Sequence, residues 1–164
     1  MVINGFIIMG VAGCGKSTIA RLLADKLNWD FLDADDFHSP ENIAKMKSGI
    51  PLDDSDRAPW LAALNKMLIS TLQAGHHPVL ACSALKESYR AKLCQDIDGL
   101  QFIYLKGSYD LIWPRISQRE GHYMKPEMLK SQFEVLEEPV NALVVDVRLR
   151  PEEIVRNIVK TFQL

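Results

Sequence analysis

The stretch GVAGCGKS, from Gly10 to Ser17, decides the fold class of this sequence. It matches the pattern G-x-x-x-x-G-K-[ST] and lies between an apolar run that predicts a strand and a segment that predicts a helix, the context that this pattern requires. The glycines let the backbone curl so that several N–H groups point at phosphate oxygens, and the following helix adds its positive end. The sequence therefore predicts a phosphate-binding loop.

Each polar side chain of this loop has an expected task. Lys16 is expected to neutralise the β- and γ-phosphates of a nucleotide, and the Ser17 hydroxyl to hold Mg²⁺. The alternatives are an ordinary glycine-rich turn and a dinucleotide-binding turn, but the glycines here are spaced G-x-x-G-x-G, whereas dinucleotide turns need G-x-G-x-x-G. The residues expected to bind ATP in this loop are Gly10, Val11, Ala12, Gly13, Cys14, Gly15, Lys16, Ser17 and Thr18.

Outward from the loop, short apolar runs alternate with segments of helical spacing. The runs are Ile3–Met9, Trp29–Leu32, Pro78–Cys82, Phe102–Leu105 and Leu143–Val145. Continuous apolar runs are typical of parallel strands that are buried on both faces. The alternation predicts an α/β fold, a three-layer α/β/α sandwich with a mainly parallel sheet of about five strands. Residues 47–56 and 121–128 lack periodicity, and we expect irregular binding loops there.

Length, composition and charge exclude several classes of protein. The chain has 164 residues, and we expect one domain that spans residues 1–164. With 48% hydrophobic and 24% charged residues, it is unlike disordered or collagen-like chains. A net charge of −2 does not favour nucleic acid or an anionic membrane as a partner, and the N-terminal apolar run is too short for a signal peptide or a membrane span. Three cysteines without C-x-x-C spacing indicate a reduced, cytoplasmic protein.

An acidic cluster follows the second apolar run, in the stretch FLDADDFH. Asp33, Asp35 and Asp36 are expected at the carboxyl edge of the sheet, on the side where the phosphate loop opens. In an alternating strand end, Asp33 and Asp35 point one way and Asp36 the other. Because the carboxylates repel one another, we expect a cation or substrate hydroxyls among them, with a polar turn as the alternative. One carboxylate can orient Mg²⁺ through water while the next accepts a hydroxyl proton.

Two arginines stand four residues apart in a segment that predicts a helix. Arg115 and Arg119 therefore share a face, where like charges repel unless an anion lies between them. The loop-like stretch GHYMKP follows. We expect a lid over residues 115–128 whose arginines bind the transferring phosphate and exclude water, with solvated surface arginines as the alternative.

The loop alone does not separate an enzyme from a nucleotide-binding module. The guanine-reading pattern N-K-x-D of nucleotide switch proteins is absent, because Asn65-Lys66 is followed by Met67-Leu68. A small-molecule kinase is the leading hypothesis. A non-catalytic, regulatory nucleotide-binding module is the alternative from another class.

Several further stretches carry a family resemblance. They are MGVAGCGKST, DADDFH, DDSDRAPWL, LACSALKESYR, YLKGS, REGHYM and SQFEVLEEP. Together they resemble the gluconate kinases (gluconokinases), which are small relatives of shikimate kinase and the nucleoside monophosphate kinases. The resemblance runs nearly from end to end. It implies transfer of the ATP γ-phosphate to the primary hydroxyl of D-gluconate, giving 6-phosphogluconate, with a shikimate- or nucleotide-type kinase of the same fold as the alternative.

The resemblance also implies roles for individual residues. Asp35 is similar to the acid that such kinases place against the attacking hydroxyl, and Asp33 to the carboxylate in the outer shell of Mg²⁺. Arg57 lies where related enzymes hold the substrate carboxylate, with a salt bridge to Asp53, Asp54 or Asp56 as the alternative. The adenine base is expected near the lid arginines and the backbone of Val147–Pro151.

The implied sites and partners complete the expectation. A substrate-binding segment is expected over residues 38–60, and the partner is a small molecule, with ATP and Mg²⁺ as cofactors and a homodimer as the assembly. The expected catalytic residues are Lys16, Asp35 and Arg119. The expected substrate-binding residues are Asp35, Asp36, His38, Lys45 and Arg57.

Overall fold

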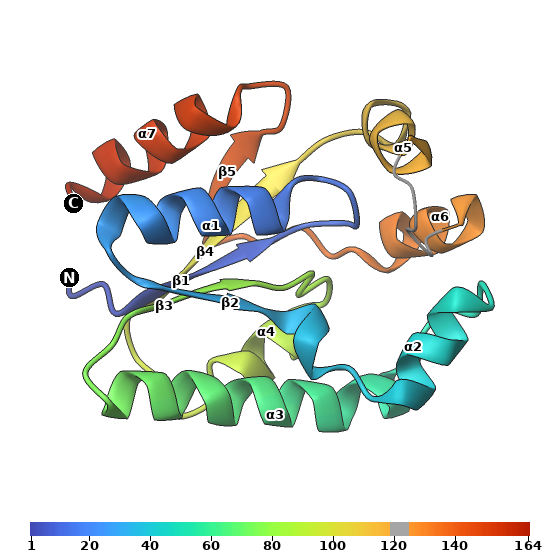
Figure 1. The fold of residues 1–164 in the computed structure, drawn as a ribbon, viewed down its shortest axis with the longest axis horizontal. Helices are drawn as coiled ribbons and strands as arrows, with labels where there is room; N and C mark the ends of the chain where they lie inside the picture. The colour runs from blue at the N-terminus through green and yellow to red at the C-terminus, as the bar shows by residue number, and fades with distance from the viewer. Residues whose placement is uncertain (119–124) are drawn as a thin grey trace.

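Five parallel strands form the sheet of this protein (Figure 1). The computed structural model describes residues 1–118 and 125–164. The strands are β1 (Gly5–Met9), β2 (Asp30–Asp33), β3 (Pro78–Ala81), β4 (Leu100–Lys106) and β5 (Leu143–Asp146). Their order is β2-β3-β1-β4-β5, and each neighbouring pair is parallel. The predicted α/β class and the five-stranded parallel sheet are confirmed.

Helices cover both faces of the sheet and its carboxyl end. They are α1 (Lys16–Leu27), the 3₁₀ helix η1 (Ala34–Phe37), α2 (Pro40–Lys47), α3 (Asp54–Gln73), α4 (Glu87–Leu93), α5 (Tyr109–Ser117), α6 (Pro126–Val135) and α7 (Pro151–Phe162). In Figure 1, α1 and α7 lie on one face and α3 and α4 on the other, while α2, α5 and α6 lie beyond the carboxyl ends of the strands. No helix among the described residues is long and apolar enough to cross a membrane.

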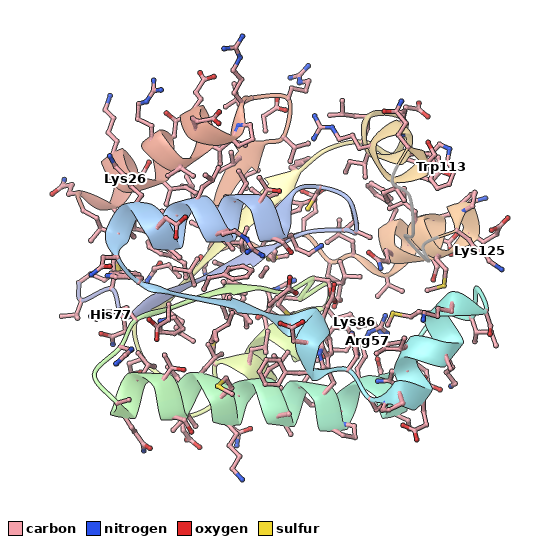
Figure 2. All side chains as sticks on the ribbon, viewed as in Figure 1. Lys26, Arg57, His77, Lys86, Trp113 and Lys125 are labelled. Carbon is pink, nitrogen blue, oxygen red and sulfur yellow. The ribbon has the colours of Figure 1, made fainter. Side chains whose placement is uncertain are left out.

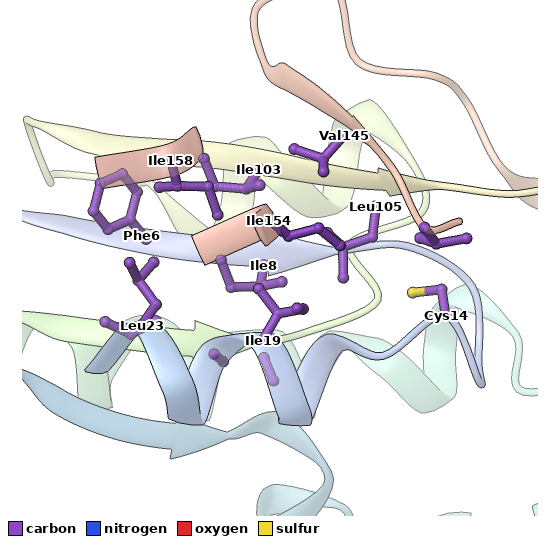
Figure 3. Close-up of a cluster of buried hydrophobic side chains, with 14 of the residues drawn as sticks. Phe6, Ile8, Cys14, Ile19, Leu23, Ile103, Leu105, Val145, Ile154 and Ile158 are labelled. Atoms are coloured by element: carbon purple, nitrogen blue, oxygen red, sulfur yellow. The ribbon is translucent and has the colours of Figure 1, made fainter. Parts of the chain in front are cut away.

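The central strand β1 explains why its sequence is continuously apolar. All of its residues are buried, and alternate side chains enter different cores. Phe6 and Ile8 pack with α1 and α7, and Figure 3 shows them beside Leu23 and Ile158. On the other face, Ile7 belongs to the core that α3 and α4 cover. A strand with helices on both faces needs apolar side chains at every position.

The segment between α2 and α3 is shorter than predicted. The Ser39 side chain accepts a hydrogen bond from Asn42 N and starts α2. Asp53 and Asp56 form a capping box, in which each side chain accepts a hydrogen bond from the other's backbone N–H, so α3 begins at Asp54. The prediction that residues 47–56 are irregular is therefore wrong at both ends, and only residues 48–53 are irregular.

The second predicted irregular stretch is helical at its end. Residues 119–124 lie outside the described part of the chain. α6 begins at Pro126, where proline fits the first turn because it has no N–H to satisfy. Residues 126–128, which we expected to be irregular, therefore form the first turn of a helix.

Candidate functional site

The phosphate loop connects β1 to α1, at the carboxyl end of the sheet. Gly15 has a φ of 100° and is the residue before the first turn of α1. Gly13 has a φ of 76°, and a Cβ there would lie 2.2 Å from the Cγ1 of Ile116 in α5. Only glycine therefore allows the loop to curl and to pack against α5. No side chain caps the start of α1, and the N–H groups of a first helical turn have no partner within the helix, which is the arrangement that binds phosphate.

The two polar side chains at the end of the loop are both held in place. Lys16 Nζ donates to the carbonyl of Val11 at 3.0 Å, so the ammonium group lies back over the loop. The Ser17 hydroxyl donates to Asp33 Oδ2 at 2.8 Å, and Asp33 Oδ1 accepts from the backbone N–H of Asp35 at 3.0 Å. The first acid of the cluster is therefore fixed against the loop.

The donor set around Ser17 fits Mg²⁺. A hydroxyl oxygen and a carboxylate oxygen lie 2.8 Å apart there. Within the described residues there is no group of three or more His, Cys, Asp or Glu that could hold a metal ion. Mg²⁺ needs no such group, because in kinases it keeps several waters and takes the remaining ligands from one or two side chains and the phosphates of the nucleotide.

The acidic cluster is arranged differently from the predicted strand end. β2 stops at Asp33, which caps the 3₁₀ helix η1, so the alternation of the strand does not continue to Asp35. The prediction that strand alternation would set the directions of Asp33, Asp35 and Asp36 is therefore wrong, because Asp35 and Asp36 do not belong to the strand. Asp33 and Asp35 still line one cavity, whereas Asp36 is not part of the cavity lining, although Asp35 and Asp36 are both exposed.

This cavity is bounded by the phosphate loop, η1, the start of α3, the end of β3 and one face of α6. It brings together most of the residues predicted for the site. They are Ala12, Gly13, Gly15, Lys16, Ser17, Thr18, Asp33, Asp35, His38 and Arg57. The buried side chains of Trp60 and Met128 form its apolar wall.

His38 and Trp60 form a stacked pair at the wall of the cavity. The ring centroids lie 4.2 Å apart with an interplanar angle of 15°, and Trp60 Nε1 donates to the carbonyl of Ala34 at 2.8 Å. Burial lowers the pKa of His38, and this effect outweighs the negative charge of Asp35, which raises the pKa, while the positive charge of Arg57 lowers it further. His38 therefore presents a neutral imidazole to the cavity at pH 7.

The two predicted substrate cations have different surroundings. Lys45 Nζ forms an ion pair with Asp56 at 2.9 Å, and this hydrogen bond raises the pKa of the lysine. Arg57 forms no ion pair in the described part of the chain. Its Nη1 donates to the carbonyl of Leu52 and, at 3.2 Å, to the hydroxyl of Tyr89. The alternative of a salt bridge between Arg57 and a neighbouring aspartate is therefore wrong, and its charge remains available to a ligand.

A second cavity lies on the other side of the phosphate loop. Its lining includes Gly13, Thr18, Leu149 and Arg115, which donates from Nη2 to the carbonyl of Val147 at 2.9 Å. The sequence had placed the adenine base near Arg115 and this backbone, and the structure brings the two segments together. Arg119 and the centre of the predicted lid lie outside the described residues.

Contacts that the sequence did not predict hold the cavity together. Gln132 on α6 accepts a hydrogen bond through Oε1 from the N–H of Ala12 at 2.8 Å, across 120 positions of the chain. Arg90 is buried and donates to the carbonyls of Ala84, Leu85 and Glu137. Neither side chain matches a motif with a known mechanism. Their only signal was membership of the resembling stretches SQFEVLEEP and LACSALKESYR.

Two of the three cysteines, Cys14 and Cys82, are buried in the core. Cys14, Cys82 and Cys94 are free. Burial raises the pKa of Cys82 to about 12, and burial also raises the pKa of Cys14. These buried thiols remain protonated at neutral pH and act as apolar side chains of the core.

Comparison with known proteins shows which family this chain resembles. Residues 12–163 match the family model described as shikimate kinase. A probable gluconokinase from Mus musculus is 48% identical over 150 residues, which cover 81% of this chain and 82% of that protein. The chain belongs to the shikimate kinase family and, within it, to the gluconokinases. The family expected from the sequence is confirmed.

Two solved structures show the same fold for this gluconokinase-family chain. An unliganded sugar kinase from Janibacter sp. HTCC2649 superposes with a TM-score of 0.90 at 42% identity, covering 96% of this chain and 93% of that chain. A gluconokinase from Sinorhizobium meliloti 1021 gives a TM-score of 0.84, also at 42% identity, covering 98% and 92%. The similarity in sequence and in fold to these two proteins therefore extends along nearly the whole chain.

Proposed function

We propose that this protein is a gluconokinase, which transfers the γ-phosphoryl group of ATP to the primary hydroxyl of D-gluconate and forms 6-phospho-D-gluconate. One observation carries the proposal. The phosphate loop with Lys16 lines the same cavity as Arg57, an arginine that has no counter-ion among the described residues. The gluconokinase relatives, which match most of the chain, support the same assignment.

The cavity suits a substrate with a carboxylate and a reacting hydroxyl. A guanidinium binds a carboxylate through two parallel hydrogen bonds, which a neutral polyol cannot accept in the same way. We assign the substrate carboxylate to Arg57 and the reacting hydroxyl to Asp35. Lys45 is the weaker candidate because Asp56 already neutralises it. Asp36 lies outside the cavity lining and remains a prediction from the sequence alone.

The mechanism follows from these positions. Lys16 and the loop N–H groups bind the phosphates and hold them in line with the acceptor. Ser17 and Asp33 are the residues that would hold Mg²⁺, which when bound neutralises charge on the phosphate oxygens. The Asp35 carboxylate accepts the proton of the substrate hydroxyl as its oxygen forms the new bond to phosphorus and the bond to the leaving phosphate breaks.

The two arginines of the predicted lid complete the proposal. Arg115 lines the second cavity beside Val147, which we assign to the adenine of ATP. Arg119 is assigned to the transferring phosphoryl group from its place in the sequence. Closure of residues 115–128 would exclude water, which otherwise competes with gluconate for the phosphoryl group.

A coupled assay that reports ADP tests the function directly. The acceptors are D-gluconate, sorbitol, shikimate and nucleoside monophosphates. Sorbitol is the matched control because it keeps a six-carbon polyol chain and lacks the carboxylate. We expect gluconate to be the preferred acceptor, with 6-phosphogluconate as the product.

Three results of this assay contradict the proposal. Equal turnover of gluconate and sorbitol rejects carboxylate recognition. Preference for shikimate or a nucleoside monophosphate rejects the acceptor and favours the alternative kinases of the same fold. ATP binding without turnover of any acceptor favours the regulatory module.

A cytoplasmic homodimer belongs to the same proposal. ATP as a substrate and the three free cysteines support a reducing compartment. The dimer rests on the family resemblance alone. Light scattering after gel filtration tests it, and the mass of a monomer at micromolar concentration contradicts it.

A further inference from the structure

Arg57 stands on a rigid support at the start of α3. It is the fourth residue of that helix and directly follows the capping box of Asp53 and Asp56. Its backbone N–H donates to the carbonyl of Asp53 at 3.1 Å. Because these hydrogen bonds close the first turn just before Arg57 and include its own N–H, the origin of the side chain is fixed. The direction of its guanidinium then depends on what the end of the side chain contacts.

The guanidinium has one end occupied and one edge open. Nη1 carries two hydrogens, and it donates to the carbonyl of Leu52 and to the Tyr89 hydroxyl. Both hydrogens are therefore used. Among the described residues, Nε and Nη2 have no hydrogen-bond partner. The edge formed by Nε and Nη2 is the one that can bind both oxygens of a carboxylate.

The direction of each hydrogen bond in this group is determined. A guanidinium only donates, so the Tyr89 oxygen accepts from Arg57 and its own proton goes elsewhere. The hydroxyl donates to Asp54 Oδ1 at 2.5 Å, and Asp54 also accepts from Lys86 Nζ at 3.2 Å. The hydrogen bond from Tyr89 lowers the pKa of Asp54, while burial raises the pKa of Tyr89. At neutral pH the acceptor is ionised and the hydroxyl keeps its proton.

The Tyr89 ring anchors this chain of hydrogen bonds in the protein. Tyr89 is 3% exposed and belongs to the core beneath α3 and α4. The guanidinium carbon of Arg57 lies 5.3 Å from the ring centroid, and Lys86 Nζ lies 5.5 Å from it. Figure 2 shows Arg57 and Lys86 together near the start of α3. Since Asp54 pairs with Lys86, the net positive charge that remains is that of Arg57.

We propose that Tyr89, held by Asp54, is a positioning residue for substrate recognition. It fixes Nη1 so that Arg57 presents only its Nε–Nη2 edge, and this edge selects a planar monocarboxylate over a neutral polyol. The inference rests on the proposed function, because it assumes that Arg57 binds the carboxylate of the acceptor. It adds a residue from α4 to the determinants of specificity.

Removal of one hydroxyl tests this assignment. Tyr89→Phe keeps the ring, its packing and its contact with the guanidinium, and loses only the hydrogen bonds. We expect the KM for gluconate to rise about three- to tenfold, the effect of one hydrogen bond. The kcat at saturating gluconate, the KM for ATP and the melting temperature should change little. Tyr104→Phe is the matched control, because Tyr104 is buried in the same core and does not line the cavity.

A double-mutant cycle separates this inference from the proposed function. We expect Arg57→Gln to raise the KM for gluconate more than Tyr89→Phe, and the double variant to be no worse than Arg57→Gln alone, since the hydroxyl then has no guanidinium to hold. An unchanged KM in Arg57→Gln overturns carboxylate recognition by Arg57. If Arg57→Gln raises the KM but Tyr89→Phe does not, or if the two effects are additive, the role of Tyr89 is overturned and the function stands. A lower melting temperature with a loss of kcat in Tyr89→Phe also overturns it, in favour of a structural role.

Discussion

Arg90 offers the sharpest prediction about stability. It is the one buried charged residue in the described part of the chain, with 4% of its surface exposed. Its donors join three carbonyls from two segments, those of Ala84 at 2.7 Å, Leu85 at 3.2 Å and Glu137 at 2.9 Å. Nε and Nη2 also donate to the exposed carboxylate of Glu87, which water can solvate when the arginine is removed. Arg90→Met keeps an unbranched apolar stem and removes every donor.

The magnitude follows from what each carbonyl loses. The Ala84 carbonyl is buried and is left without this donor, the carbonyl of Glu137 is half-buried and can turn to water, and that of Leu85 keeps the N–H of Glu137 at 2.8 Å. A buried acceptor without a donor costs about 1–3 kcal/mol. Release of a desolvated guanidinium offsets part of the loss. We expect the free energy of unfolding to fall by about 1–3 kcal/mol, which corresponds to a Tm lower by about 2–12 °C.

Urea unfolding followed by circular dichroism measures this change. The m-value should stay constant, so that the midpoint shift reports stability. Arg156→Met, on the exposed face of α7, is the matched control and should change the unfolding free energy by less than about 0.5 kcal/mol. A loss in Arg90→Met that is no larger than that of the control refutes the reasoning from buried carbonyls.

Three further predictions concern the site and the core. Lys16→Ala should fold normally, as judged by its melting curve, and lose nearly all phosphoryl transfer, because the ammonium group is needed only on the phosphates; near-normal turnover contradicts the phosphate loop. Asp35→Asn should lower kcat by about 10²–10⁴-fold with a small change in KM, and the exposed Asp36→Asn should be mild; the reverse order would move the base to Asp36. Because burial raises the pKa of Cys82 from 9.0 to about 12, the unfolded chain loses this proton first, and stability should fall as the pH rises from about 9 toward 12. Cys82→Ala should flatten that slope by up to about 1.4 kcal/mol per pH unit, and an unchanged slope in urea titrations contradicts the assignment.

The sheet and the phosphate loop could be predicted because their signals are local. Strands covered on both faces are continuously apolar, so β1 and β3 stand out in the sequence. The loop needs glycine at positive φ, and Gly13 and Gly15 both lie within the one short motif that identifies the loop. The predicted ends of helices were wrong where a capping interaction decides at which residue the helix begins. The capping box of Asp53 and Asp56 extended α3 into a stretch that looked irregular.

The acceptor side of the site was only partly predictable. Asp33, Asp35 and Arg57 were found, but the partners of Arg57 were not, since Leu52 offers a backbone carbonyl and Tyr89 lies 32 positions away. A charged residue among aspartates suggests an ion pair, yet the capping box occupies Asp53 and Asp56, Lys45 also engages Asp56, and Tyr89 and Lys86 engage Asp54. Arg57 forms no ion pair with these aspartates because other groups already satisfy them, and this competition exists only in the folded protein.

The two halves of the cavity therefore differ in how the chain encodes them. The phosphate half is a run of consecutive residues whose geometry depends on glycine and on the start of one helix. The acceptor half is assembled from η1, the start of α3 and α6, with Tyr89 of α4 in contact with Arg57. It is joined to the phosphate half by the bond from Ala12 to Gln132. Substitutions that change the acceptor can spread over several elements without touching the loop. A kinase of this fold can thus keep ATP binding while its acceptor changes, and the identity of the acceptor depends on contacts such as that between Tyr89 and Arg57 more than on the motif that reveals the fold.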